Sequence, residues 1–334
     1  MNVEELMQRA ISLADPYKYK TKPNPVVGCL ILKNDLIISE GVHEEFGSDH
    51  AEVNAIKNAK LKMGSIFDSS KDLTLICTLE PCNHEGKTGA CTEAIIKSGI
   101  KKVVVGCVDP NPLVAGKGIE RLIKSGIDVE VGFCEEEIQE QNKFFFYKHQ
   151  NTKPFITLKI ASSKDGKSHN QDGSRAWITC EKSREDVQLV RAIHDVIMTG
   201  GNTVLNDNPL MNARVGFPVN QPKKILLTSK EGLNNNFFKD AEVMTIRERN
   251  IHVIIEDLKH LDINSILVEA GPKLANSFLL SGLVDELIIY ESPDNLGPNA
   301  VSWFEEDKAV ENLGFKLESS YKIESDVKKI YKKC

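Results

Sequence analysis

Four side chains in the first part of the chain have the chemistry of a metal centre: His50, Glu52, Cys82 and Cys91. One histidine and two cysteines offer three ligands for Zn²⁺ and leave the fourth tetrahedral position to water, as a catalytic site requires. Zinc lowers the pKa of bound water from about 15.7 towards about 7, so zinc hydroxide forms at neutral pH. Glu52 is the predicted general acid/base, because a carboxylate beside the zinc can carry protons from the water to the substrate.

The two cysteines are ambiguous when they are taken alone. Cys82 and Cys91 fit packing residues, a redox pair or half of a metal site, and His50 with Glu52 at a predicted helix start favours the metal. The order His-x-Glu, then Pro-Cys and a later Cys, is the pattern of zinc-dependent nucleobase deaminases, in which the glutamate is not a ligand. Three other cysteines lie inside apolar runs and are predicted core residues: Cys29, Cys77 and Cys107.

The segments around these residues alternate between strand-like and helical patterns. Apolar runs predict strands over residues 26–33, 36–43, 72–79, 101–108 and 127–133. Amphipathic patterns predict helices at the start of the chain and near residues 50–60, 91–99 and 118–126. This alternation predicts an α/β domain with a layered sheet.

The second half of the chain is again α/β in pattern, without sequence similarity to the first half. A polar stretch that runs into a proline predicts a boundary near residues 148–153, so we expect domains at 1–147 and 148–334. The alternating segment 321–333 predicts a final, partly exposed strand. Small residues follow predicted strands at 200–204 and 269–278, and such junctions suit a phosphate or are ordinary strand-to-helix connections. A Rossmann domain is not indicated, because the G-x-G-x-x-G motif is missing.

Composition narrows the class of protein. The 334 residues carry a net charge of −6, which gives no general attraction to nucleic acid. The first residues lack the pattern of a secretory signal, and no apolar run reaches the length of a membrane span. Eight cysteines without an export signal favour a reducing, cytoplasmic compartment and argue against a disulfide framework. We therefore expect a cytoplasmic enzyme that acts on a small molecule.

Four segments carry a resemblance to a known family: KTKPNPVVGC, EGVHEEFGSDHAEVNAI, TLEPCNHEGKTGAC and GCVDPNPLVAGKGIERLIKSGIDV. They closely resemble the deaminase half of the bifunctional riboflavin-biosynthesis deaminase/reductase, and the long gap between Cys82 and Cys91 separates them from cytidine and tRNA adenosine deaminases. The resemblance implies a cytidine-deaminase-like three-layer α/β/α domain over residues 1–147. It also implies substrate contacts from Asn24, His43, His84, Lys87, Thr88, Asp109 and Asn111, although PNP and DPNP also fit simple turns. Gly89 and Ala90 depart from the family, which commonly has two prolines there.

The resemblance continues through PFITLKIASSKDGK, the segment from WITCEKSRED to NPLMNAR, and ILVEAGPKLANSFLLSGLVDELIIY. These look like the reductase domain of the same enzyme and imply a dihydrofolate-reductase-like α/β fold that uses NADPH. The implied cofactor contacts are Ala161, Trp177, Thr203, Asp207, Ser229, Gly271, Pro272, Lys273, Leu274, Ala275, Asn276 and Ser277. The implied substrate contacts are Arg175, Arg191, Met211, Arg214 and Glu269. Arg175, Cys180 and Ala270 depart from the common family pattern.

The implied function is a pair of consecutive reactions. The first is hydrolytic deamination of 2,5-diamino-6-ribosylamino-4(3H)-pyrimidinone 5′-phosphate by zinc hydroxide. The second is NADPH-dependent reduction of the ribosyl side chain, which gives 5-amino-6-ribitylamino-uracil 5′-phosphate, and the family implies a homodimer or homotetramer. The alternatives are a nucleoside or tRNA-base deaminase with an unrelated appendage, a binding protein that keeps the fold, and an enzyme with one active half.

Overall fold

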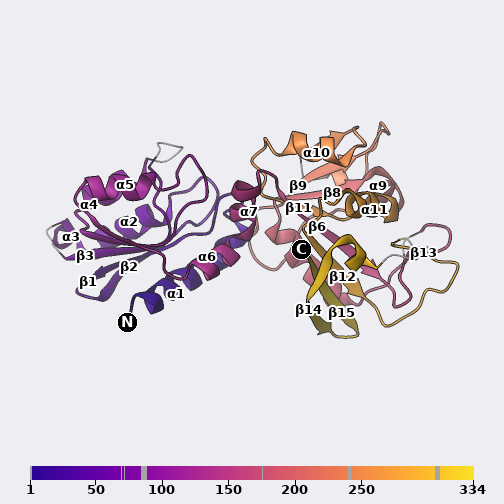
Figure 1. The fold of residues 1–334 in the computed structure, drawn as a ribbon, viewed down its shortest axis with the longest axis horizontal. Helices are drawn as coiled ribbons and strands as arrows, with labels where there is room; N and C mark the ends of the chain where they lie inside the picture. Colours follow the sequence, from indigo (N-terminus) through magenta and orange to yellow (C-terminus); the bar gives the residue numbers. More distant parts are fainter. Residues whose placement is uncertain are drawn as a thin grey trace. The chain divides into compact units, whose positions relative to one another are not determined.

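The computed structural model describes residues 2–68, 70, 72–83, 89–174, 176–239, 242–304 and 309–334. The chain divides into two compact units, Met1–Gln150 and Asn151–Cys334, each with its own sheet (Figure 1). The division lies in helix α7 (Lys143–Asn151), and the predicted boundary at residues 147 and 148 falls in the same helix. Within the described residues, no helix is long and apolar enough to span a membrane. Four predicted site residues lie outside the described residues: His84, Lys87, Thr88 and Arg175.

The first unit contains a five-stranded sheet in the order β2-β1-β3-β4-β5. Its strands are β1 (Gly28–Lys33), β2 (Leu36–Val42), β3 (Leu73–Leu79), β4 (Lys102–Cys107) and β5 (Asp128–Val131). The first three strands pair antiparallel, and β3, β4 and β5 run parallel. Because β3 and β4 are parallel neighbours, the residues that follow them emerge at the same edge of the sheet.

Helices cover both faces of this sheet, so the predicted three layers are present (Figure 1). One face packs against α2 (Ala51–Met63), α4 (Cys91–Ser98) and α5 (Lys117–Lys124). The other packs against α1 (Val3–Ala14), α6 (Glu135–Gln141) and α7, and the short α3 (Ser65–Asp68) follows α2. The three cysteines predicted as core residues, Cys29, Cys77 and Cys107, are buried.

The second unit is built on an eight-stranded sheet in the order β10-β9-β8-β11-β6-β12-β15-β14. Its strands are β6 (Phe155–Ser162), β8 (Val196–Gly200), β9 (Lys223–Leu227), β10 (Val243–Ile246), β11 (Ser265–Val268), β12 (Glu286–Glu291), β14 (Phe315–Ile323) and β15 (Asp326–Lys333). The strands from β10 to β12 in this order are parallel, while β15 and β14 are antiparallel. A separate pair joins β7 (Lys167–His169) to β13 (Val301–Ser302).

Helices also cover both faces of the second sheet. Helices α10 (Ile251–Leu258) and α11 (Pro272–Ser281) pack on one face, and α8 (Glu181–Ile193) packs on the other. The short α9 (Gly201–Asp207) follows β8 directly. The turns after β8, β9 and β11 therefore share one edge of the sheet, where ligands commonly bind in open α/β folds.

The predicted single strand at residues 321–333 is wrong. The structure divides this segment between β14 and β15, which form an antiparallel hairpin. Glu324 adopts a positive φ of 50° at the turn, and Ile323 and Asp326, which flank the two turn residues, pair across the hairpin. The turn is formed by Glu324 and Ser325, two polar residues that also fit the alternating pattern of a single strand.

Candidate active sites

The three predicted zinc ligands come together although they lie on three different elements. His50 is the N-cap residue of α2, Cys82 follows β3, and Cys91 is the first residue of α4. The Nδ1 atom of His50 lies 3.5 Å from the Sγ atom of Cys82 and 3.3 Å from that of Cys91. The backbone N–H of Cys91 donates to the Cys82 sulfur at 3.4 Å, which ties the start of α4 to the cluster.

This donor set fits a zinc ion. All three ligand atoms lie within 4.8 Å of one another. Ligands at about 2.1 to 2.3 Å from a tetrahedral zinc are separated by about 3.5 Å, close to the distances between His50 and the two sulfurs. A hydrogen bond from the Cys91 thiol, together with one from His50, lowers the pKa of the Cys82 thiol, and the same bond raises the pKa of Cys91, so this pair favours a thiolate at Cys82, the form in which cysteine binds metal.

Glu52 lies in the first turn of α2, two residues after His50, and its side chain is only 3% exposed. Burial raises the pKa of its carboxyl group to about 7. A carboxyl group with this pKa both accepts and releases protons near neutral pH, as a proton carrier in catalysis must. Its position beside the cluster therefore agrees with the predicted role.

His43 and Asn24 form a polar pair next to the ligand cluster. The His43 ring centre lies 5.5 Å from that of His50. Its Nδ1 atom lies 3.1 Å from the Asp49 carbonyl oxygen, which can only accept, so Nδ1 donates and Nε2 accepts from the Asn24 amide at 3.1 Å. Burial lowers the pKa of His43, which keeps this ring neutral and its two roles fixed.

The remaining described residues of the predicted pyrimidine site lie in the loop after β4. Asp109 is buried, and its Oδ1 atom accepts a hydrogen bond from the N–H of Asn111 at 2.8 Å. The side-chain oxygen of Asn111 accepts in turn from the N–H of Leu113 at 3.0 Å. Since β3 and β4 end at the same edge, this loop and Cys82 emerge from neighbouring strand ends.

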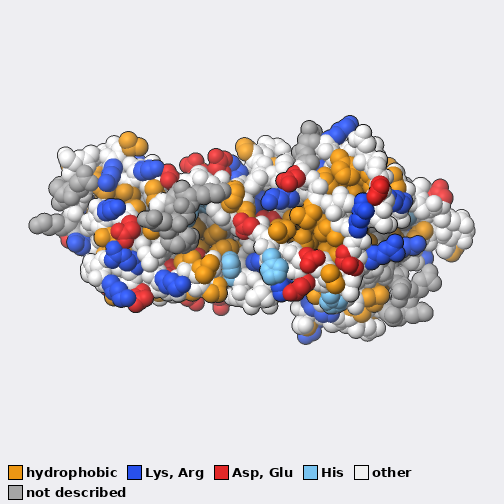
Figure 2. All heavy atoms as spheres, turned by 90° about the horizontal axis from the view of Figure 1, so that it is seen from above, with side chains coloured by type: hydrophobic (Ala, Val, Ile, Leu, Met, Phe, Trp, Pro, Cys, Tyr) orange, Lys and Arg blue, Asp and Glu red, His pale blue; other side chains and the backbone are white. Residues whose placement is uncertain are grey.

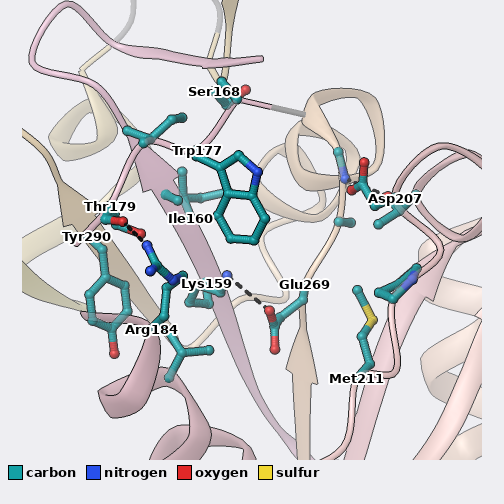
Figure 3. A pocket seen from close by; sticks show the side chains of 18 of the residues that line it. Lys159, Ile160, Ser168, Trp177, Thr179, Arg184, Asp207, Met211, Glu269 and Tyr290 are labelled. Atoms are coloured by element: carbon teal, nitrogen blue, oxygen red, sulfur yellow. Dashed lines mark hydrogen bonds and ion pairs between the residues drawn. The ribbon is translucent and has the colours of Figure 1, made fainter. Parts of the chain in front are cut away.

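In the second unit, a cavity of about 510 Å³ contains a buried ion-pair network (Figure 3). The Glu269 side chain binds Arg191 through two hydrogen bonds of 2.5 and 2.9 Å, and it pairs with Lys159 at 2.9 Å. Burial alone would raise the pKa of Glu269, but the positive charges of Arg191 and Lys159 outweigh it and hold this pKa below its usual range. The carboxylate is therefore ionised at neutral pH and fixes both cations.

Lys159 was missed by the sequence prediction. It lies in β6 between the buried residues Leu158 and Ile160, and its side chain is 16% exposed. A lysine inside a buried parallel strand is unusual, because such strands are nearly continuous apolar runs. This interruption of FITLKIAS is the signal that would have identified it.

Trp177 stands at the opening of the same cavity and is 70% exposed. In the view of Figure 3, its indole lies between Arg184 on one side and Asp207 on the other. The Arg184 guanidinium lies 5.2 Å from the centre of the Trp177 ring, and Arg184 also donates to the Thr179 carbonyl oxygen. An exposed aromatic ring at a cavity mouth is suited to stacking on a flat ligand.

A second cavity, of about 750 Å³, shares part of its wall with the first. The shared residues are His169, Thr203, Asp207, Gly271 and Pro272. Thr203 accepts a hydrogen bond from the N–H of Gly271 at 3.2 Å, so the turns after β8 and β11 are joined here. The two cavities together suit a long ligand that meets a smaller one.

Most of the predicted reductase contacts that the structure describes line one cavity or both. Those at the first cavity are Ala161, Trp177, Arg191, Thr203, Asp207, Met211, Arg214, Glu269, Gly271 and Pro272. Those that line only the second are Ser229, Lys273, Leu274 and Ser277. Ala275 and Asn276 line neither: Ala275 is fully buried in the core, and the Asn276 amide donates to the carbonyl oxygens of Pro272 and Trp303 at 2.7 and 2.8 Å. Ala275 therefore packs into the core, while the Asn276 amide is bound to the backbone of Pro272 and Trp303, which line the first cavity.

Comparisons with known proteins find matches for both units. The family described as the cytidine and deoxycytidylate deaminase zinc-binding region matches residues 1–107, and the RibD C-terminal domain matches residues 154–329. The riboflavin biosynthesis protein RibD of Aquifex aeolicus is 37% identical, covering 92% of this chain and 95% of its own length. RibD of Escherichia coli is 36% identical, covering 90% of each chain.

Solved structures are similar over the whole chain. Acinetobacter baumannii RibD aligns with a TM-score of 0.90 at 35% identity, covering 99% of this chain and 98% of its own. A diaminohydroxyphosphoribosylaminopyrimidine deaminase/5-amino-6-(5-phosphoribosylamino)uracil reductase from Thermotoga maritima aligns with a TM-score of 0.86 at 34% identity, covering 99% of each chain. These findings confirm the predicted fold class of both halves and the predicted family. The chain belongs to the RibD family of bifunctional riboflavin-biosynthesis enzymes, which join a zinc-dependent deaminase to an NADPH-dependent reductase.

Proposed function

We propose that His50, Cys82 and Cys91 hold the zinc ion and that Glu52 is the proton carrier of the deaminase. The observation that carries this proposal is the convergence of three ligand atoms within 4.8 Å beside a buried carboxyl group. A zinc ion held by these ligands would supply a water molecule activated for attack near neutral pH. Glu52 would take the two protons of that water one after the other and pass one to the ring nitrogen and the other to the departing amine, so that the amino group leaves as ammonia and the water oxygen becomes the carbonyl oxygen.

The substrate that we assign to this site is 2,5-diamino-6-ribosylamino-4(3H)-pyrimidinone 5′-phosphate. Its polar ring needs donors and acceptors in fixed positions, and the neutral His43 with Asn24 and the buried Asp109 with Asn111 supply them. His84, Lys87 and Thr88 remain assigned to the substrate by family resemblance, and they lie outside the described residues. A nucleic-acid substrate is not favoured, because on the face shown in Figure 2 the described Lys and Arg side chains are interspersed with Asp and Glu.

We assign the reduction of the ribosyl side chain to the first cavity of the second unit. NADPH, when bound, supplies the hydride, so the protein must chiefly position the two reactants. Arg191, Arg214 and Met211 line the cavity that receives the sugar phosphate, and Glu269 holds Lys159 and Arg191 at its base. Arg214 suits a phosphate group, because a guanidinium can donate two hydrogen bonds to it.

The second cavity suits the rest of the coenzyme. At the wall that it shares with the first, Thr203, Asp207 and Gly271 are placed for the nicotinamide half. The other end is lined by Ser229 and by three cationic side chains: Lys230, Arg247 and Arg249. Glu248 also lines this end, and its side chain accepts hydrogen bonds from the backbone N–H groups of Arg249 and Asn250. A group of cations at the far end suits the 2′-phosphate that distinguishes NADPH from NADH.

Assembly and compartment belong to the same proposal. We propose a cytoplasmic homo-oligomer, a dimer or a tetramer, as the family resemblance implies. Light scattering on the full chain measures the assembly directly, and a monomeric mass would contradict it.

The test of the deaminase assignment uses two separate assays, ammonia release from the diaminopyrimidine phosphate and NADPH oxidation with its deaminated product. In Glu52→Gln, ammonia release is expected to fall by more than about 100-fold, because the proton carrier is lost. NADPH oxidation with the already deaminated substrate is expected to keep its wild-type rate. Ammonia release at an undiminished rate in Glu52→Gln would sink the proposed mechanism.

A further inference from the structure

Glu80 joins two parts of the deaminase site that no prediction connected. It follows β3 directly and precedes Pro81 and Cys82, and its side chain is 4% exposed. Its own N–H donates to the carbonyl oxygen of Cys107 at 3.0 Å, at the end of β4. Glu80 therefore lies where the metal-ligand segment and the Asp109 loop leave neighbouring strands.

Both carboxylate oxygens of Glu80 accept hydrogen bonds from the backbone that follows β4. Oε2 accepts from the N–H groups of Asp109 at 3.3 Å and Gly116 at 2.9 Å. Oε1 accepts from those of Gly118 at 2.8 Å and Ile119 at 3.3 Å. The last two groups belong to the first turn of α5, where free N–H groups and the helix dipole favour an anion.

Helix α5 lacks a cap of its own. Its N-cap residue is Gly116, which has no side chain to accept a hydrogen bond from the first turn. The carboxylate of Glu80, which follows β3 and is distant in the sequence, takes over this role. Removing its charge therefore affects the whole segment from Asp109 to Ile119 and not a single contact.

Close packing fixes this segment against the metal-ligand segment. A Cβ atom added to Gly118 would lie 2.0 Å from the Pro81 carbonyl oxygen, so only glycine permits the start of α5 to approach so closely. Pro81 is the residue before the ligand Cys82. By contrast, the hydrogen bonds from Asn111 to Asp109 and from Leu113 to Asn111 lie inside the loop and do not fix its distance from the metal site.

We propose that Glu80 is a positioning residue of the deaminase, whose carboxylate holds Asp109 and Asn111 in register with Cys82. The proposal rests on the proposed function, because it takes Asp109 and Asn111 as substrate contacts. The carboxylate hydrogen bonds reach the loop and α5 but not the metal ligands. Loss of its charge is therefore expected to weaken substrate binding while zinc stays bound.

The test compares Glu80→Gln with Glu130→Gln in the full chain. Glutamine keeps the size of the side chain but turns a donating NH₂ towards backbone N–H groups, which repel it. For Glu80→Gln we expect the KM of ammonia release to rise about 10-fold, with a smaller change in kcat, as for the loss of hydrogen bonds to a charged group. Zinc content and NADPH oxidation are expected to stay at wild-type values. Glu130 is the matched control, because it lies on β5 of the same sheet and makes a half-exposed ion pair with Lys102.

Hydrogen exchange gives a second readout that does not depend on turnover. Amides of residues 109–119 are expected to lose protection in Glu80→Gln and to keep it in Glu130→Gln, while β1 stays protected in both. Unchanged exchange in this segment overturns the proposal, and so does an unchanged KM in a variant with full zinc content. Loss of zinc also counts against it, since Glu80 would then support the metal site and not the substrate loop. If the wild-type enzyme releases no ammonia, the proposed function fails, and the exchange measurement still decides the role of Glu80.

Discussion

The two units of this enzyme hold their reacting groups in different ways. In the first unit, a histidine, two cysteines and a buried glutamate converge on one point from the ends of a strand and the starts of two helices. In the second unit, the candidate residues are spread over two adjoining cavities, and the deepest of them form the ion-pair network of Lys159, Arg191 and Glu269. The first site is a compact cluster, and the second is a long surface.

The difference follows from where the chemistry resides. A metal site demands particular ligand atoms at fixed separations, so a few residue types are indispensable. In the reductase the coenzyme carries the hydride, and the protein contributes position and charge, which several side chains can share. Substitutions should therefore abolish the first activity at single positions and reduce the second by degrees.

The largest effect that we expect in the second unit comes from Glu269→Gln. This substitution leaves Arg191 and Lys159 buried without their anion, so their positions in the cavity are lost. NADPH oxidation is expected to fall about 100-fold, which is a loss typical of a buried charge at a reacting site. Ammonia release from the first unit is the internal control and should keep its rate; a parallel fall in both activities would mean that the two units do not work independently.

A smaller effect is expected at the far end of the second cavity. Arg249→Ala should weaken binding of 2′,5′-ADP about 10-fold, because one charged contact to the 2′-phosphate is worth about 1.4 kcal/mol. Binding of ADP, which lacks this phosphate, should not change. Calorimetry measures the affinities for both nucleotides in the wild-type chain and in Arg249→Ala. Arg9→Ala, in the first unit, is the control. Equal losses for the two nucleotides would place the 2′-phosphate elsewhere.

The smallest effect concerns stability and pH. The pKa of Glu269 in the folded protein lies below its unfolded value of about 4.3, so the folded state holds its proton less tightly than the unfolded state does. Its stabilising contribution is therefore complete above about pH 5 and declines as the pH falls through 4.3 towards the lower, folded pKa.

Both tryptophans, Trp177 and Trp303, belong to the second unit, so their fluorescence reports the unfolding of that unit in urea. The difference in the free energy of unfolding between wild type and Glu269→Gln should shrink as the pH is lowered from 7 to 3. A constant difference would contradict the ion-pair account.

The sequence signal for the metal cluster is chemical. A histidine and two cysteines at these positions have few other reasons to occur together, and the structure brings the ligand atoms of His50, Cys82 and Cys91 within 4.8 Å of one another. The layered α/β sheet of the first unit followed from the alternation of strand and helix patterns, and its three layers followed from the family resemblance. The role of Glu80 was not predicted, although this residue lies in the segment TLEPC. Its hydrogen-bond partners are backbone N–H groups, which leave no pattern in a sequence.

The second unit was predicted less completely, for related reasons. Family resemblance assigns these residues as a set, but sequence order alone could not tell that Ala275 packs into the core while Lys273 and Ser277 line the second cavity. Lys159 was overlooked because it lies inside a strand-like run. The hairpin of β14 and β15 was read as one strand, since alternation continues across its short turn.

The central claim is that one zinc ion, held by His50, Cys82 and Cys91, serves the deaminase alone. It is tested most directly by removing metal with a chelator and returning zinc in steps, with ammonia release and NADPH oxidation measured at each step. We expect ammonia release to vanish in the metal-free enzyme and to recover in proportion to zinc, up to one ion per chain, while NADPH oxidation on the deaminated substrate stays constant. Ammonia release that persists without metal, or NADPH oxidation that falls and recovers with it, would contradict this account.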